Sequence, residues 1–142
     1  MNANLQKAKN LLESENYTCV VWGENQVYTT KERGVAPLLH WLDAGLNLAG
    51  FSAADRVVGR GAAFLYCLLG VREVYARVMS QPAAEVLKAH GINAQTDKYV
   101  EGIINRAGTG PCPFEAAVMH ITDAREALSA IRQKRRQMQE GK

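Results

Sequence analysis

The chain has 142 residues, of which 47% are hydrophobic and 22% charged, values that are typical of one folded domain and exclude a disordered chain. The formal net charge is +3, but a short run near the C-terminus supplies four positive charges, from Arg132, Lys134, Arg135 and Arg136, so the rest of the chain is nearly neutral. We expect this run to be a solvated helix end, with an anionic partner as the alternative, and nucleic-acid binding is disfavoured because no basic face is interleaved with aromatic residues.

Apolar residues recur at helical spacing over residues 4–15, which predicts a first helix that packs on a sheet. β-branched and aromatic residues at 17–22 and 26–30 flank the turn sequence Gly23-Glu24-Asn25, which predicts an antiparallel hairpin. A second helix is predicted from Pro37 to about Ala44, because proline suits the first helical turn.

The middle of the chain predicts a strand followed by an interior helix. The strand is predicted over about residues 46–53, so that Asp55 lies where it ends. Residues 57–69 are apolar almost all round, which is typical of a helix buried between two layers, and Gly70 is expected to end it.

The rest of the chain predicts two strands and three helices. A strand over residues 73–79 is followed by a helix that Ser80 and Pro82 open and Gly91 closes. The remaining predicted elements are a strand over 98–105, a loop over 106–111, a helix beginning at Pro113 and a last helix with Thr122 as its N-cap.

After the hairpin, strands alternate with helices, and such crossovers within one sheet are parallel and right-handed in nearly all cases. We therefore expect an α/β fold, a three-layer α/β/α sandwich with a five-stranded mixed sheet. In open sheets of this kind the ligand crevice lies beyond the carboxyl ends of the parallel strands, where helix N-termini point. This rule selects three candidate segments, residues 32–36, 55–62 and 105–115.

The third segment combines a Gly-rich loop with a well-marked helix start. Cys112 is expected at the N-cap and Glu115 at the capping-box position. A thiol at the positive end of a helix dipole can become a nucleophile, so Cys112, Asp55 and Glu115 are the catalytic candidates, with capping and packing as the alternative. The loop supplies further ligand-binding candidates, Asn105, Arg106, Gly108 and Thr109.

The second segment carries Asp55 and Arg56 at the predicted strand end and Gly59 at the mouth of the buried helix. Arg56 or Arg60 could meet a phosphate or carboxylate, and glycine allows a ligand to approach the backbone closely. The sequence is neither a P-loop nor GxGxxG, and the alternative is that Asp55 is simply a helix N-cap.

Cysteine and histidine spacing disfavours a metal site. Cys19, Cys67 and Cys112 are widely spaced and form no CxxC pair, which also argues against a disulfide framework. The three histidines occur in neither HxE nor HExxH, and no serine has GxSxG context. We therefore expect no zinc, no other metal and no cofactor.

The N-terminus has no apolar signal core, and the longest apolar run, within residues 61–71, is too short to cross a bilayer. The sequence therefore predicts a cytoplasmic protein away from membranes. A single domain over residues 1–142 is expected, ordered over about 4–137 and ending in a basic tail.

Two motifs, ADRVVGRGAA at residues 54–63 and NRAGTGPCPFE at 105–115, carry a family resemblance. Over nearly its whole length the chain resembles domain-of-unknown-function family eighteen ninety-three, a small bacterial family grouped with the cytidine deaminase-like superfamily. The motifs are similar to that family's Asp-Lys-Val-Val-Gly and Cys-Pro-Met-Glu patterns, with Arg56 in place of Lys and Phe114 in place of Met. The resemblance implies a cytidine deaminase-like fold and no known activity.

Zinc enzymes of that superfamily need a His or Cys with a nearby Glu at the start of one helix, and two thiolates at the start of the next. The resemblance places residues 33–36 and 55–63 at those positions, and neither stretch offers a ligand set. The segment 112–115 has one cysteine and comes after the fifth predicted strand. We therefore expect the chain not to be a zinc-dependent deaminase, and whether it is an enzyme stays open.

The leading hypothesis is a domain that binds a small anionic metabolite or nucleotide-like ligand without zinc. Asp55, Arg56, Arg106, Cys112 and Glu115 are expected to surround one cleft. The alternative is a non-catalytic regulatory or protein-interaction module on the same scaffold. Assembly into a homo-oligomer stays open.

Overall fold

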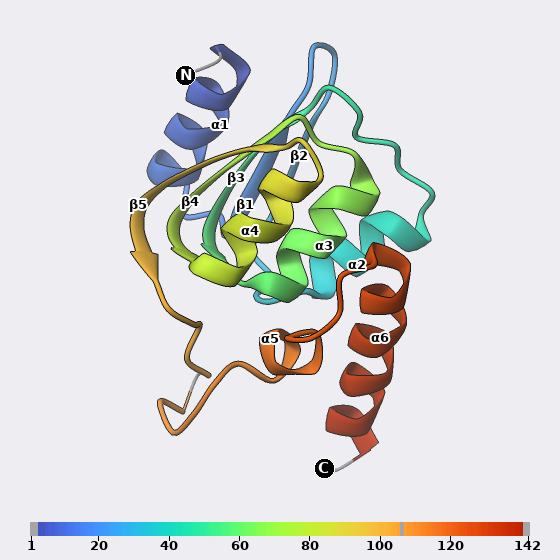
Figure 1. The fold of residues 1–142 in the computed structure, drawn as a ribbon. Coiled ribbons are helices and arrows are strands. Elements are labelled where there is room, and N and C mark those ends of the chain that lie inside the picture. The colour runs from blue at the N-terminus through green and yellow to red at the C-terminus, as the bar shows by residue number, and fades with distance from the viewer. Residues whose placement is uncertain (1–2, 106, 141–142) are drawn as a thin grey trace.

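One five-stranded sheet, in the order β2-β1-β3-β4-β5, forms the middle layer of the computed structural model, which describes residues 3–105 and 107–140 (Figure 1). β1 pairs antiparallel with β2 and β3, whereas β3, β4 and β5 are parallel. The α/β fold class with a five-stranded mixed sheet is therefore confirmed. The elements are α1 (Ala3–Ser14), β1 (Cys19–Trp22), β2 (Val27–Thr30), α2 (Ala36–Asp43), β3 (Ser52–Val58), α3 (Arg60–Leu69), β4 (Glu73–Ser80), α4 (Gln81–Ala89), β5 (Asn93–Val100), α5 (Pro113–Ala117) and α6 (Ala124–Glu140).

Helices cover the two faces of the sheet unequally. On one face α1 lies against β1, β3 and β4, and its Leu5, Ala8 and Leu12 are buried (Figure 1). On the other face α3 is flanked by α2 and α4, and α5 and α6 also pack against it. α3 is buried almost all round, as its sequence predicts, because it lies between the sheet and these outer helices.

The third strand lies further along the chain than the predicted 46–53. β3 runs from Ser52 to Val58, so Asp55 lies inside the strand and not at its end, and that prediction was wrong. Residues 46–51 form turns, in which Leu48 is buried and its N–H donates to the Leu69 carbonyl. β3 is buried on both faces by small residues, Ala53 on the side of α3 and Ala54 on the side of α1, so the strand has little of the apolar bulk that would mark it in the sequence.

The fifth strand was also misplaced. β5 spans Asn93–Val100 and not 98–105, and most of its side chains are exposed or half-buried because it is an edge of the sheet. An edge strand with polar side chains gives no apolar pattern to detect, and such side chains discourage pairing with other chains. The stretch that follows it is irregular, with an isolated bridge between Ile104 and Pro111.

The starts of α4 and α6 have different caps. Ser80 is the N-cap of α4, as predicted, and its hydroxyl accepts from the Ala83 N–H at 3.1 Å. At α6 the cap comes from Asp123 and not from the predicted Thr122, because the Asp123 carboxylate accepts from the Glu126 N–H at 3.0 Å. α6 continues to Glu140, so the basic run is part of a helix. None of the described helices combines the length and apolar character needed to cross a membrane.

Candidate functional site

The three segments selected from the sequence meet around one cavity of about 730 Å³ at the carboxyl end of β3. Its lining includes Asp55, Arg56, Gly59, Asn105, Cys112 and Glu115. Gly108 and Thr109, which were predicted to bind ligand, are not among the lining residues. The predicted Arg106 lies outside the described residues. The shared depression is therefore present, and the chemical roles assigned to these residues remain predictions.

Asp55 is one end of a row of three hydrogen-bonded side chains in the cavity wall. The Tyr66 hydroxyl donates to Asp55 Oδ2 at 2.6 Å, and Cys19 Sγ lies 3.1 Å from the same hydroxyl oxygen. Cys19 and Asp55 are paired across β1 and β3, which brings the thiol and the carboxylate to one place. The sequence did not predict either partner of Asp55, because Tyr66 lies in an apolar helix and Cys19 in an interior strand, where packing in the core is expected.

Burial sets the ionisation of Asp55, Tyr66 and Cys19. Removal from water raises the pKa of Asp55 from 3.8 to about 6, and hydrogen bonds from Tyr66 and the backbone lower it only in part. Burial and the neighbouring Asp55 charge raise the pKa of Cys19 and that of Tyr66 well above their usual values. Cys19 and Tyr66 therefore stay protonated at neutral pH, and Asp55 is the one of these three side chains that can exchange a proton.

Arg56 supplies positive charge to the cavity. Its Nη2 donates to Asn16 Oδ1 at 2.8 Å, which ties the guanidinium to the end of α1. Its Nε is buried and has no hydrogen-bond partner within the described part of the chain. A buried donor without an acceptor costs free energy, and this Nε is shielded from the cavity as well as from water.

The first turn of α3 opens into the same cavity. Gly59 is the N-cap and offers no side-chain acceptor, and Gly61 and Ala62 line the cavity. First-turn N–H groups have no partner within their own helix, and the helix dipole places positive potential there. The Glu115 carboxylate already occupies this positive end, since its Oε2 accepts from the Arg60 N–H at 2.8 Å.

Glu115 does not form the predicted capping box. Its carboxylate is buried and reaches away from its own helix, where Oε2 accepts from the Arg60 N–H at 2.8 Å and from the Ser80 hydroxyl, and Oε1 accepts from the Ile103 N–H at 2.6 Å. The Cys112 N–H, which a capping box would satisfy, donates to the Ile103 carbonyl at 2.7 Å. These contacts support a structural role, in which Glu115 fastens α5 to the start of α3.

Arg60 is occupied by the protein and cannot serve as the anion-binding arginine. It is 8% exposed, and its guanidinium donates to three backbone carbonyls, those of Val118 at 2.9 Å, Pro82 at 3.3 Å and Ile121 at 2.6 Å. The two arginines that the sequence could not tell apart thus have different roles, because Arg60 joins α3 to the turn before α6.

The loop after β5 is closed by its own hydrogen bonds. The Asn105 side chain accepts from the Thr109 N–H at 3.0 Å and donates to the Thr109 hydroxyl at 3.2 Å. The Asn105 N–H donates to the Gly110 carbonyl at 2.8 Å. Asn105 faces the cavity from a fixed turn, whereas Thr109 serves the loop itself.

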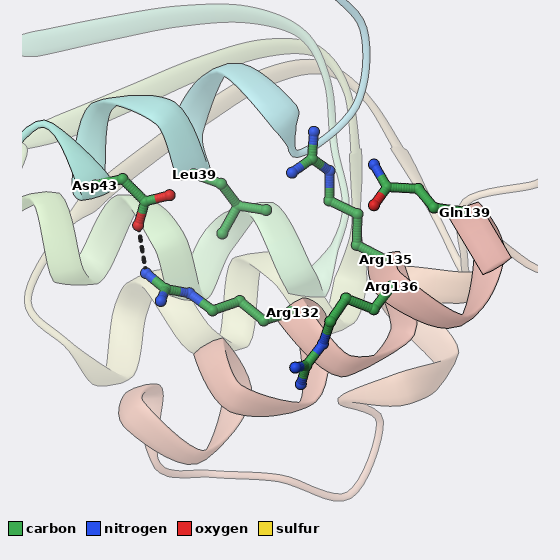
Figure 2. A pocket seen from close by; sticks show the side chains of 6 residues that line it. All are labelled: Leu39, Asp43, Arg132, Arg135, Arg136 and Gln139. Carbon is green, nitrogen blue, oxygen red and sulfur yellow. Dashed lines mark hydrogen bonds and ion pairs between the residues drawn. The ribbon is translucent and has the colours of Figure 1, made fainter.

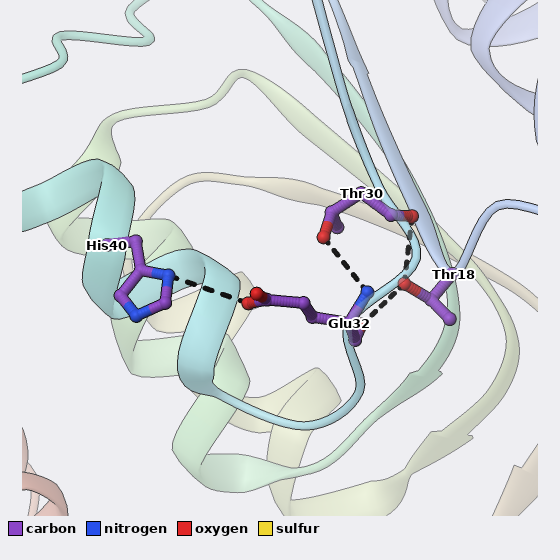
Figure 3. A network of polar contacts seen from close by, with 4 residues as sticks. All are labelled: Thr18, Thr30, Glu32 and His40. Atoms are coloured by element: carbon purple, nitrogen blue, oxygen red, sulfur yellow. Dashed lines mark hydrogen bonds and ion pairs between the residues drawn. The ribbon is translucent and has the colours of Figure 1, made fainter.

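The rim opposite this loop is held by polar contacts between the hairpin and the segment before α2 (Figure 3). The Thr18 hydroxyl donates to the Glu32 carbonyl at 2.6 Å, and the Glu32 N–H donates to the Thr30 hydroxyl at 3.1 Å. The Glu32 carboxylate lies 3.5 Å from His40 Nδ1, and both side chains are exposed. The network fixes Glu32 and Arg33 at the cavity edge.

A second, smaller cavity of about 380 Å³ lies between α2 and α6 (Figure 2). Arg132, Arg135 and Arg136 of the basic run line it, and Arg132 Nη2 pairs with Asp43 Oδ1 at 2.6 Å. Both partners of the pair are about half exposed, and such pairs contribute little to stability. In the described part of the chain, no three His, Cys, Asp or Glu side chains gather as metal ligands.

Cys112 is expected to be the thiol that reacts first at neutral pH. It is half-buried at the cavity, whereas Cys19 is 3% exposed and burial raises the pKa of Cys67 to about 12. Thiolate and access together control alkylation, so we expect iodoacetamide to modify Cys112 at least roughly tenfold faster than the other two, as measured by peptide mass spectrometry over time. The variant Cys112→Ser should lose this fast phase. Equal rates for the three thiols would leave Cys112 a structural residue.

Comparisons with known proteins place the chain in a defined group. A family model described as "Domain of unknown function (DUF1893)" matches residues 7–135. The crystal structure of a DUF1893 family protein (TM1506) from Thermotoga maritima is similar, with a TM-score of 0.86 and 23% identity over 94% of this chain and 92% of that chain. No curated protein matches significantly.

A looser likeness is to a dCMP deaminase from the cyanophage S-TIM5 in apo form. The TM-score is 0.43 and the identity 13%, over 66% of this chain and 94% of that chain. At this level we draw nothing about chemistry from the deaminase.

Proposed function

The chain belongs to the DUF1893 family. We propose that it binds a small anionic metabolite or nucleotide-like ligand in the cavity at the carboxyl end of β3. A cavity of about 730 Å³ is of the size that holds small molecules in proteins, roughly 300–1,000 Å³. The ligand's oxyanion would lie at Arg56, which lines this cavity.

Arg56 in the cavity wall is the observation that carries the proposal. The guanidinium keeps its charge at any physiological pH, and Asn16 already holds it in place, so little conformational freedom is lost when an anion binds.

Anion binding beside Asp55 would be accompanied by proton uptake, because burial raises the pKa of this carboxyl to about 6 and leaves it mostly ionised at neutral pH. A carboxyl that takes up a proton near this pH can donate a hydrogen bond to an oxyanion, whereas an ionised one would repel it. The same group could exchange a proton with a bound molecule. The ligand proposal does not depend on that second step.

Arg56→Gln is expected to weaken anion binding at least roughly tenfold, because hydrogen bonds to charged groups are worth about 1.5–3 kcal/mol. The measurement is the shift in thermal unfolding with inorganic phosphate, pyrophosphate and nucleoside monophosphates. A compound at a hundred times its dissociation constant adds about 2.7 kcal/mol to stability.

Arg77→Gln is the matched control, because Arg77 is a half-buried arginine of the neighbouring strand β4 and does not line the cavity. It should leave the shift unchanged. The proposal fails if no probe stabilises the protein, or if the two glutamine variants behave alike.

A further inference from the structure

Exposed apolar side chains gather at the cavity. Val57 is 47% exposed, Ile104 62% and Met138 42%, and all three line the cavity. The other large apolar side chains with such exposure in the described residues, Val27, Tyr99 and Met119, are not among its lining residues. Half of the strongly exposed apolar residues therefore border one depression.

These three side chains come from separate parts of the chain. Val57 belongs to β3, Ile104 to the irregular stretch after β5, and Met138 to the C-terminal half of α6. In Figure 1 that stretch and the end of α6 lie at the same end of the molecule as α5. Phe114 and Ile103 extend the apolar wall inwards.

The two ends of the cavity differ in chemistry. Arg56 supplies a positive charge at one end, and the side chains of Val57, Ile104 and Met138 form an apolar rim. Apolar surface that remains in water costs free energy in proportion to its area, and a ligand that covers it recovers that amount. A concave site of this volume suits a small molecule better than a flat protein surface.

We propose that the ligand is amphipathic, with an oxyanion at Arg56 and a compact acyl or aryl body against Val57, Ile104 and Met138. This inference rests on the proposed function, since it uses the same cavity and the same anion-binding end. It adds the apolar half of the ligand, which a binding site for inorganic phosphate alone would not need.

Alkyl sulfonates of increasing length test the inference, because their charge does not change with pH. Methanesulfonate, butanesulfonate, hexanesulfonate and benzenesulfonate are titrated by calorimetry, with 1-hexanol as the uncharged probe. We expect the dissociation constant to fall roughly two- to fourfold for each added methylene, with benzenesulfonate also tighter than methanesulfonate. 1-Hexanol should bind much more weakly than hexanesulfonate.

Two pairs of variants locate the apolar contact. Met138→Ser should weaken the dependence of the dissociation constant on sulfonate chain length. Met119→Ser should leave that dependence unchanged, because Met119 has a similar exposure, 40%, but does not line the cavity. Val57→Thr is compared in the same way with Val27→Thr, since Val27 is also an exposed strand valine. Because all four side chains are exposed, these variants should fold.

The outcomes separate the two proposals. Sulfonates that bind through Arg56 with an affinity independent of chain length would overturn the amphipathic ligand and leave anion binding intact. A length dependence that Met138→Ser and Val57→Thr do not change would also overturn it. Equal binding of hexanesulfonate and 1-hexanol, unaffected by Arg56→Gln, would instead reject the anion-binding function.

Discussion

Glu115→Ala is expected to lower the free energy of unfolding by about 3–5 kcal/mol, the range for removing one partner of a buried charged interaction. The substitution leaves the Arg60 N–H, the Ile103 N–H and the Ser80 hydroxyl without their acceptor in the interior. Gly59 and Gly102 pack directly against this carboxylate, since a Cβ at either would lie 3.2 Å and 3.4 Å from its oxygens. The space is therefore shaped to the carboxylate, and a shorter side chain leaves a void.

Denaturant unfolding of Glu115→Ala and Glu101→Ala measures this effect. Glu101 is exposed and lies near Ile103 in the sequence, so its replacement should change stability by less than about 0.5 kcal/mol. Glu115→Gln keeps the volume but presents an amide N–H₂ to donors, and we expect an intermediate loss. If Glu115→Ala costs no more than Glu101→Ala, the carboxylate does not hold these elements together.

Asp55→Asn is expected to stabilise the protein at high pH. The pKa of Asp55 is 3.8 in an unfolded chain and about 6 in the fold, so the folded protein binds this proton more tightly. The resulting contribution to stability is complete below about pH 4 and is lost as the pH rises through 6. Asparagine cannot ionise. The free energy of unfolding of the variant, relative to that of the wild type, should therefore be up to about 3 kcal/mol higher at pH 8 than at pH 4.

Guanidinium unfolding at pH 4, 6 and 8 checks the sign and size of this effect. Asp97→Asn is the control, because Asp97 also accepts from a tyrosine hydroxyl, that of Tyr75 at 2.5 Å, but is exposed. Its comparison with Asp55→Asn isolates burial as the cause. A difference between Asp55→Asn and wild type that does not grow from pH 4 to pH 8 would show that Asp55 ionises normally.

A carboxyl that weakens the fold at neutral pH is informative about the site. Perturbed acids in cavities are concentrated at functional sites, where stability is given up for chemistry or binding. Glu115 and Asp55 thus differ, although both line the cavity and both were proposed as catalytic. Glu115 is fully engaged by protein donors, whereas Asp55 accepts from the Tyr66 hydroxyl and the Val57 N–H and has no ion pair among the described residues.

The order of helices and strands could be predicted from the sequence because it depends on local patterns. Helical spacing found α1, α4 and α6, the apolar surface of α3 marked it as interior, and the parallel crossovers predicted the mixed sheet and the edge where the site lies. The patterns failed where packing does not require large apolar residues. β3 is lined with alanines and β5 is a polar edge, so both strands were shifted.

The sequence by itself determined which segments meet, but only the tertiary structure decided what each polar side chain does there. Glu115 has hydrogen-bond partners 12, 35 and 55 residues away in the sequence. The contacts of Tyr66 with Asp55 and Cys19 join α3 to β3 and β1. A capping rule considers neighbours within one helical turn, and so it assigned Glu115 to its own helix. Hydrogen bonding and desolvation depend on whatever atoms lie within a few ångströms, and distant parts of the chain supply those atoms only after it has folded.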